Sequence, residues 1–125
     1  MTDPGIREYV GVYDADGGVR GEVAYVVGHL LRMRECALCD ITHTWRRKPE
    51  WDAMAARLGV PFTLVHRNEI DDDAVADGVA GSGLPVVLGR TDDGWAVVLD
   101  RAQLESAAGR VDVFEGILTD AARRV

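Results

Sequence analysis

Two cysteines and a histidine form the part of this chain whose residue types and spacing could do chemistry. Cys36 and Cys39 are the chain's two cysteines; they are separated by two residues, and His43 follows four positions later. A Cys-x-x-Cys spacing brings two thiols close enough to close a short disulfide ring, and it also brings two thiolates onto one metal ion. The segment is therefore a candidate site for thiol redox chemistry or for metal binding.

In the redox interpretation, Cys36 is the attacking thiol and Cys39 resolves the mixed disulfide that forms. A helix that begins here would stabilise the Cys36 thiolate through its unpaired amides and its dipole, and His43 would assist from one turn further on. Glu35 and Asp40 act in the opposite direction, because negative charge beside a thiol raises its pKa.

In the metal interpretation, Cys36, Cys39 and His43 are three ligands of a zinc ion, and three protein ligands leave an open position for water. A fourth ligand would come from Asp40 or from His66. A third possibility is that the two cysteines pack as small apolar side chains beneath a loop, as free cysteines often do. The residues alone leave all three interpretations open.

The composition is that of an ordinary globular domain with an acidic surface. The 125 residues are 47% hydrophobic and 28% charged, which is enough for one domain with its own core. The net charge of -7 argues against nucleic acid or an anionic membrane as a main partner, because both need a basic surface. The polar start and the lack of a long apolar stretch predict a cytoplasmic protein without a leader or a membrane span. Two cysteines would usually be reduced there.

Hydrophobic periodicity and turn residues predict alternating strands and helices in a single domain of residues 1–125, with residues 1–7 as a flexible end. Stretches rich in β-branched and aromatic residues are expected to be strands: residues 8–13, 60–66, 86–90 and 95–100. Stretches with apolar residues at helical spacing are expected to be helices: residues 20–34, 49–58, 74–80 and 111–121. Asp93-Gly94 is expected to close a hairpin between the last two strands. The acidic run 71–73 is expected to cap the helix at residues 74–80.

The second half of the chain, read as strand, short helix, Leu84-Pro85, hairpin and helix, resembles the C-terminal half of the thioredoxin fold. In that superfamily a proline, usually cis, opens the third strand of the sheet and faces the Cys-x-x-Cys pair. Pro85 is similar to that proline, and Cys36-Ala37-Leu38-Cys39 is similar to the redox motif at a helix start. The resemblance implies a single-domain thioredoxin-like α/β sandwich with a mixed central sheet of about four strands, and a cis bond before Pro85.

The chain departs from the family's pattern before the cysteines. Thioredoxins have their cysteines directly after the first strand, whereas here the extra helix expected at residues 20–34 intervenes. That helix is either an insertion before the redox loop or the family's own first helix, which would move the cysteines away from Pro85. The first case implies a cytoplasmic thiol–disulfide oxidoreductase without a cofactor, acting on protein or small-molecule thiols through Cys36, Cys39, His43 and Pro85. The second leaves a non-catalytic binding domain on the same fold.

Overall fold

The computed structural model describes residues 5–14, 37–42 and 48–125. In this part of the chain, strands in the order β2-β1-β3-β4 form one four-stranded sheet. The strands are β1 (Glu8–Tyr13), β2 (Phe62–His66), β3 (Val86–Thr91) and β4 (Gly94–Leu99). β1 is parallel to β2 and antiparallel to β3, and β3 is antiparallel to β4. The chain therefore has the mixed α/β class and the mixed four-stranded sheet that its sequence predicts.

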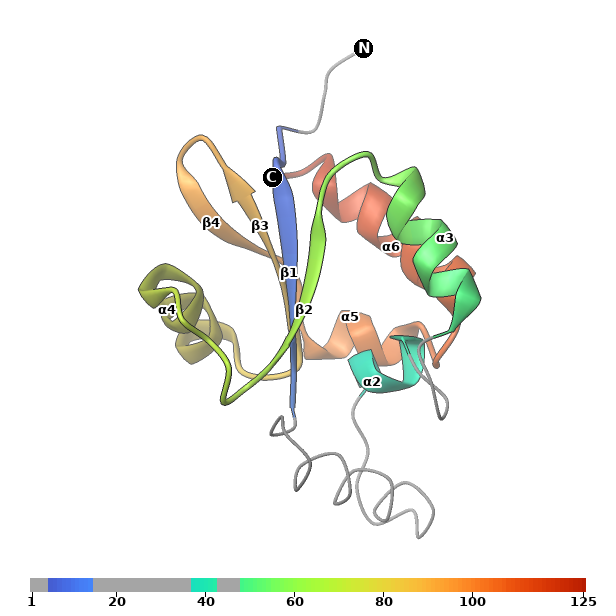
Figure 1. Cartoon of the computed structure of the whole chain (residues 1–125), viewed down its shortest axis with the longest axis horizontal. Coiled ribbons are helices and arrows are strands. Elements are labelled where there is room, and N and C mark those ends of the chain that lie inside the picture. Colours follow the sequence, from blue (N-terminus) through green and yellow to red (C-terminus); the bar gives the residue numbers. More distant parts are fainter. Residues whose placement is uncertain (1–4, 15–36, 43–47) are drawn as a thin grey trace, which may run out of the picture.

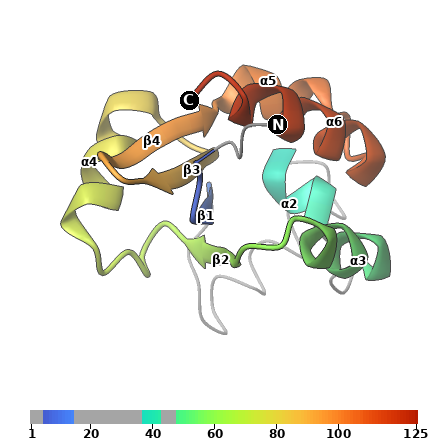
Figure 2. The ribbon, with the colours of Figure 1, turned by 90° about the horizontal axis from the view of Figure 1, so that it is seen from above.

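Helices cover both faces of this sheet. They are α2 (Ala37–Thr42), α3 (Pro49–Arg57), α4 (Asp73–Ser82), α5 (Arg101–Ser106) and α6 (Val111–Ala122). Figures 1 and 2 show α4 on one face of the sheet and the other described helices on the opposite face. The described elements therefore form three layers, with a core on each side of the sheet.

The larger core lies between the sheet and the layer that contains α3 and α6. Its centre is aromatic: the ring of Trp51 contacts Phe62 and Phe114, with ring centroids 5.0 and 5.2 Å away. Tyr9 stacks on Phe62, with the ring centroids 5.3 Å apart. Large aromatic side chains contribute both buried area and specific ring contacts, so these four residues hold α3 and α6 against β1 and β2.

The smaller core lies under α4. Its buried members are aliphatic residues from the sheet and from the helix itself: Val12, Val75, Val86 and Leu88. α4 begins where the side chain of Asp72 accepts hydrogen bonds from the backbone N–H groups of Ala74 and Val75. This confirms the cap that the run of aspartates predicts, since a helix N-terminus has N–H groups without intrahelical acceptors.

The hairpin expected at the end of the sheet is confirmed, but the position of its turn is wrong by one residue. The last strand pair is Thr91 with Gly94, so Asp92 and Asp93 form the loop, rather than Asp93 and Gly94. The hydroxyl of Thr91 accepts a hydrogen bond of 3.2 Å from the N–H of Asp93, which favours the earlier turn. Gly94 follows with φ of 115°, a conformation that glycine adopts at little cost.

Several expected boundaries differ from the observed ones for local reasons. β2 begins at Phe62 rather than at residue 60, and the residue before it is Pro61, which has no N–H for a sheet ladder. β4 ends before Asp100 because this residue caps α5 through a reciprocal pair of bonds with Gln103. α5 is a helix that the sequence pattern does not predict. The helix expected at residues 20–34 lies outside the described residues.

Candidate functional site

Of the four residues predicted to form the redox site, Pro85 is the one the structure describes in full. The Leu84–Pro85 peptide bond is cis, as predicted, and Pro85 is buried just before β3. Cys36 and His43 lie outside the described residues, and Cys39 is described only as the third residue of α2. That the two cysteines, His43 and Pro85 come together therefore stays a prediction.

α2 packs on β1 through fully buried side chains. Leu38, Ile41 and Thr42 are 0% exposed. A Cβ atom at Gly11 would lie only 3.1 Å from Cδ2 of Leu38, so the missing side chain at Gly11 allows α2 to approach β1 this closely. The hydroxyl oxygens of Tyr13 and Thr42 lie 2.9 Å apart in a buried hydrogen bond. α2 is thus fixed to the carboxyl end of β1.

The chain before β3 reaches this same end of β1. Val12 pairs with Val86 in the antiparallel ladder. Tyr13, which follows Val12, and Pro85, which precedes Val86, are therefore at the same position along the strand direction. β2 ends here as well, because Tyr13 pairs with His66 in the parallel ladder. Open α/β sheets bind their ligands outside the carboxyl ends of the parallel strands. This end of the sheet, where β1 and β2 finish, is therefore the candidate site.

The imidazole of His66 is held at this end of the sheet by a carboxylate. Oε1 of Glu69 lies 2.6 Å from Nδ1 of His66 and also accepts a 2.9 Å hydrogen bond from the backbone N–H of His66. The backbone bond, and then the bond to the ring, lower the pKa of Glu69 below its ordinary value. An ionised Glu69 favours the proton on Nδ1, which leaves Nε2 as the basic nitrogen of the neutral ring.

His66 also contacts β1. Its ring centroid lies 5.1 Å from that of Tyr13, with the rings tilted by 50°, and 28% of its side chain is exposed. Arg67, the next residue, lies 3.3 Å from the carboxylate of Asp14, which joins the chain after β1 to the chain after β2. The site thus combines a buried hydroxyl pair with a partly exposed imidazole. We call its described members the carboxyl-end cluster: Tyr13, Thr42, His66, Glu69 and Pro85.

In the metal interpretation His66 is a possible fourth ligand, whereas Glu69 has no predicted role in any of the three interpretations. The pair has a readable signal, which is histidine at the end of a strand with glutamate three residues later, across a turn. Within the described ranges, no three histidine, cysteine, aspartate or glutamate side chains are grouped so that they could hold a metal ion.

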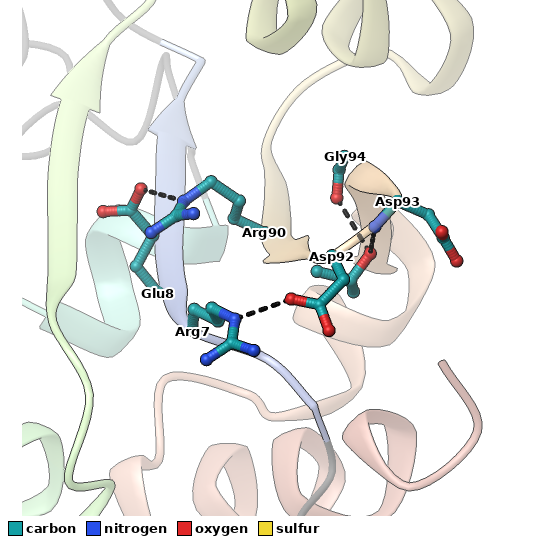
Figure 3. A network of polar contacts seen from close by, with 7 residues as sticks. Arg7, Glu8, Arg90, Asp92, Asp93 and Gly94 are labelled. Atoms are coloured by element: carbon teal, nitrogen blue, oxygen red, sulfur yellow. Dashed lines mark hydrogen bonds and ion pairs between the residues drawn. The ribbon is translucent and has the colours of Figure 1, made fainter.

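A second polar cluster lies at the opposite end of the sheet, where β1 begins and the hairpin turns (Figure 3). Nε of Arg7 lies 2.8 Å from the carboxylate of Asp92, and Nε of Arg90 lies 2.6 Å from that of Glu8. Glu8 and Arg90 are also direct partners in the sheet register. The four side chains are 30% to 77% exposed. We call them the hairpin-end cluster, and its geometry is that of surface ion pairs between neighbouring strands.

An open hollow of about 550 Å³ lies between the beginnings of α3 and α6. Its described cationic side chains all have protein partners; for example, Nζ of Lys48 donates to the carbonyl of Gly109 at 2.7 Å, and Arg110 pairs with Asp112 at 2.8 Å. Among the residues that the structure describes, none of the predicted site residues lines it. The hollow is therefore a weaker candidate than the carboxyl-end cluster.

No family model, curated protein or solved structure matches this chain. In the ranges that the structure describes, no helix has the length and apolar character needed to cross a membrane.

Proposed function

We propose that this chain has a thioredoxin-like fold and acts in the cytoplasm as a small thiol–disulfide oxidoreductase. Cys36 and Cys39 are its redox pair, His43 assists them, and Pro85 lies across from them. The sheet supports the fold, since two parallel strands are followed by an antiparallel hairpin, with helices on both faces. This is the arrangement that the order of elements in the second half of the chain implies.

One observation carries the proposal. α2, whose first residue directly follows Cys36, is fixed to the end of β1 at which the chain enters β3 after Pro85. The buried hydrogen bond between Tyr13 and Thr42 makes this attachment, and the pairing of Val12 with Val86 brings Pro85 to the same end. This supports the arrangement in which the helix expected at residues 20–34 is an insertion and the cysteines stay near Pro85.

The chemistry is an exchange of two electrons between dithiol and disulfide. The thiolate of Cys36 attacks one sulfur of a substrate disulfide; the S–S bond breaks and the other substrate sulfur leaves as a thiolate that takes up a proton. Cys39 then loses its proton and attacks the sulfur of Cys36, which releases the second substrate thiol. The substrate disulfide is reduced to two thiols, and the Cys36–Cys39 pair is oxidised to a disulfide.

Alkylation of single-cysteine variants tests this proposal. In Cys39→Ser, iodoacetamide should label Cys36 faster than it labels a free cysteine at neutral pH, because a redox thiol has a pKa below the ordinary value of about 8.5. In Cys36→Ser, Cys39 should label more slowly. The wild type should form a reversible internal disulfide in a glutathione buffer. A Cys36 that labels no faster than free cysteine would end the redox interpretation.

The same samples separate the two alternatives. If neither cysteine reacts until the protein is denatured, the pair is part of a core. If the purified protein contains one equivalent of zinc that protects both thiols and leaves with a chelator, Cys36, Cys39 and His43 are metal ligands instead. His43→Ala should then lower zinc affinity, whereas in the redox interpretation it alters only the thiol reactivity.

A further inference from the structure

The imidazole of His66 has a fixed orientation at the carboxyl end of the sheet. Its Nδ1 lies 2.6 Å from Oε1 of Glu69, and the same oxygen accepts the backbone N–H of His66. Its ring tilts against that of Tyr13, with the ring centroids 5.1 Å apart. A carboxylate on one ring nitrogen fixes the tautomer and stabilises the charged ring, and in this way proteins prepare an imidazole for proton transfer.

The side chain of Tyr13 joins His66 to α2. Its ring contacts the imidazole, and its hydroxyl bonds that of Thr42, the last residue of α2. α2 directly follows Cys36 and includes Cys39. Since 28% of the His66 side chain is exposed, a molecule bound at this end of the sheet can reach the ring while Glu69 keeps its bond to Nδ1.

The other polar groups at this end of the sheet are less suited to moving a proton. The hydroxyl of Tyr13 is buried in its bond to Thr42. The guanidinium of Arg67, which pairs with Asp14, does not lose its proton in proteins. An imidazole changes its protonation state near neutral pH, so it can both give and take a proton. His66 is therefore the described group at this end that fits the task.

We propose that His66 is the proton-transfer residue of the thiol–disulfide exchange and that Glu69 is its positioning residue, an inference that rests on the proposed function. As the S–S bond of the substrate breaks, the protonated ring gives the proton on Nε2 to the leaving sulfur, which departs as a thiol. The neutral ring then takes the proton that Cys39 loses when it attacks the sulfur of Cys36. The second substrate sulfur takes its proton from water. Two electrons pass from the cysteine pair to the substrate disulfide, as in the exchange without His66.

Disulfides with different leaving groups test this role. The full chain with Cys39→Ser stops at the mixed disulfide, so its rate measures the step in which one thiol leaves. Dithiodipyridine releases an acidic thiol, which leaves easily, whereas di(hydroxyethyl) disulfide releases an ordinary alkyl thiol. Adding His66→Asn should slow the reaction with the alkyl disulfide by about a hundredfold, as expected when a positioned proton donor is removed. It should leave the reaction with dithiodipyridine unchanged.

Iodoacetamide labelling of Cys36 is the reference reaction, because it releases iodide and needs no proton donor. His66→Asn keeps an N–H group for Glu69 and removes Nε2, so it should not alter the labelling rate. If His66→Asn slows both disulfides equally, or neither, the role of His66 is overturned although Cys36 remains reactive. If Cys36 in the Cys39→Ser chain labels no faster than free cysteine, the proposed function fails and this inference fails with it.

Substitutions of Glu69 test the positioning role. Glu69→Ala removes the carboxylate from Nδ1 and should slow the reaction with the alkyl disulfide, though less than His66→Asn does. Glu69→Gln keeps an acceptor oxygen and should recover part of the rate. Glu8→Gln is the matched control, because its carboxylate also makes a bond of 2.6 Å but lies at the opposite end of the sheet. It should leave the rate unchanged.

Nitrogen NMR of the neutral His66 ring gives a reading that does not depend on the thiols. The proton should be on Nδ1 in the wild type and shift in part to Nε2 in Glu69→Ala, because the bond to one ring nitrogen sets the tautomer. The spectrum of His66→Asn identifies the signals of this ring. A rate and a spectrum that Glu69→Ala leaves unchanged would overturn the positioning role of Glu69.

Discussion

The two ends of the sheet differ in the kind of polar contact they carry. The hairpin-end cluster consists of charged pairs whose side chains are 30% to 77% exposed. The carboxyl-end cluster contains a buried hydroxyl pair between Tyr13 and Thr42, and a carboxylate that fixes the imidazole of His66. Exposed ion pairs are screened by water and salt and stabilise proteins little. Buried hydrogen bonds are costly to remove. The end of the sheet with more charged pairs should therefore contribute less to the free energy of unfolding.

The largest expected effect comes from loosening the carboxyl end. Leu38→Ala removes a side chain that is 0% exposed and packs α2 on β1. We expect the free energy of unfolding to fall by about 3 kcal/mol, through lost burial and a cavity. Urea unfolding measures it. Val125→Ala, at an exposed position, should change it by less than about 0.5 kcal/mol. A loss below about 1 kcal/mol in Leu38→Ala would mean that α2 contributes little to the carboxyl end.

The hydroxyl pair at the carboxyl end should have the next largest effect. Tyr13→Phe and Thr42→Val each remove the buried bond of 2.9 Å, and each should lower the free energy of unfolding by about 1 kcal/mol. Because both variants break the same bond, the double variant should lose clearly less than the two single losses together. Strict additivity would show that the two hydroxyls are not coupled. The difference between the two ends of the sheet would then shrink to the packing of Leu38.

The parts of the fold that the sequence predicts are those set by local chemistry. α4 has its aspartate cap, α6 has its apolar stripe, and the hairpin has a turn-forming run between alternating strands. The sequence places the turn one residue too late, because its position depends on the hydroxyl of a single residue, Thr91, which bonds the loop. The sequence does not predict α5, because the expected strand 95–100 includes its capping residue, Asp100.

The candidate site was harder to predict because its contacts are not local. The hydrogen bond between the two hydroxyls joins residues 29 positions apart. The position of Pro85 beside the end of β1 depends on the register between β1 and β3. No pattern within one stretch of sequence contains that register. Pro85 itself was predicted through a family resemblance, and the role of Glu69 depends on a turn whose geometry the sequence alone leaves open.

The contribution of the Glu69 carboxylate to stability should depend on pH in the acid range. Its pKa in the folded protein is lower than its ordinary value of 4.5, so between these two values the unfolded chain binds more protons than the folded one. Its contribution is complete above about pH 4.5 and is lost as the pH falls through the lowered pKa. The stability difference between wild type and Glu69→Gln should therefore shrink over this window. A difference that is constant with pH would show that the carboxylate charge has no role in holding His66.

The smallest effect is expected at the hairpin end, although its ion pair of 2.6 Å between Glu8 and Arg90 is as short as the bond between Glu69 and His66. Glu8→Gln keeps the shape of the side chain and removes its charge. Since Arg90 is 44% and Glu8 30% exposed, we expect a loss of no more than about 0.5 kcal/mol. Repeating the urea unfolding in about 1 M NaCl should abolish this loss, because the screening length there is about 3 Å. The same salt should leave the loss in Tyr13→Phe unchanged, since a buried bond between two hydroxyls carries no net charge. A loss above about 1 kcal/mol that persists in salt would make the hairpin end as important to stability as the carboxyl end, and short distance rather than burial would then decide which contacts matter.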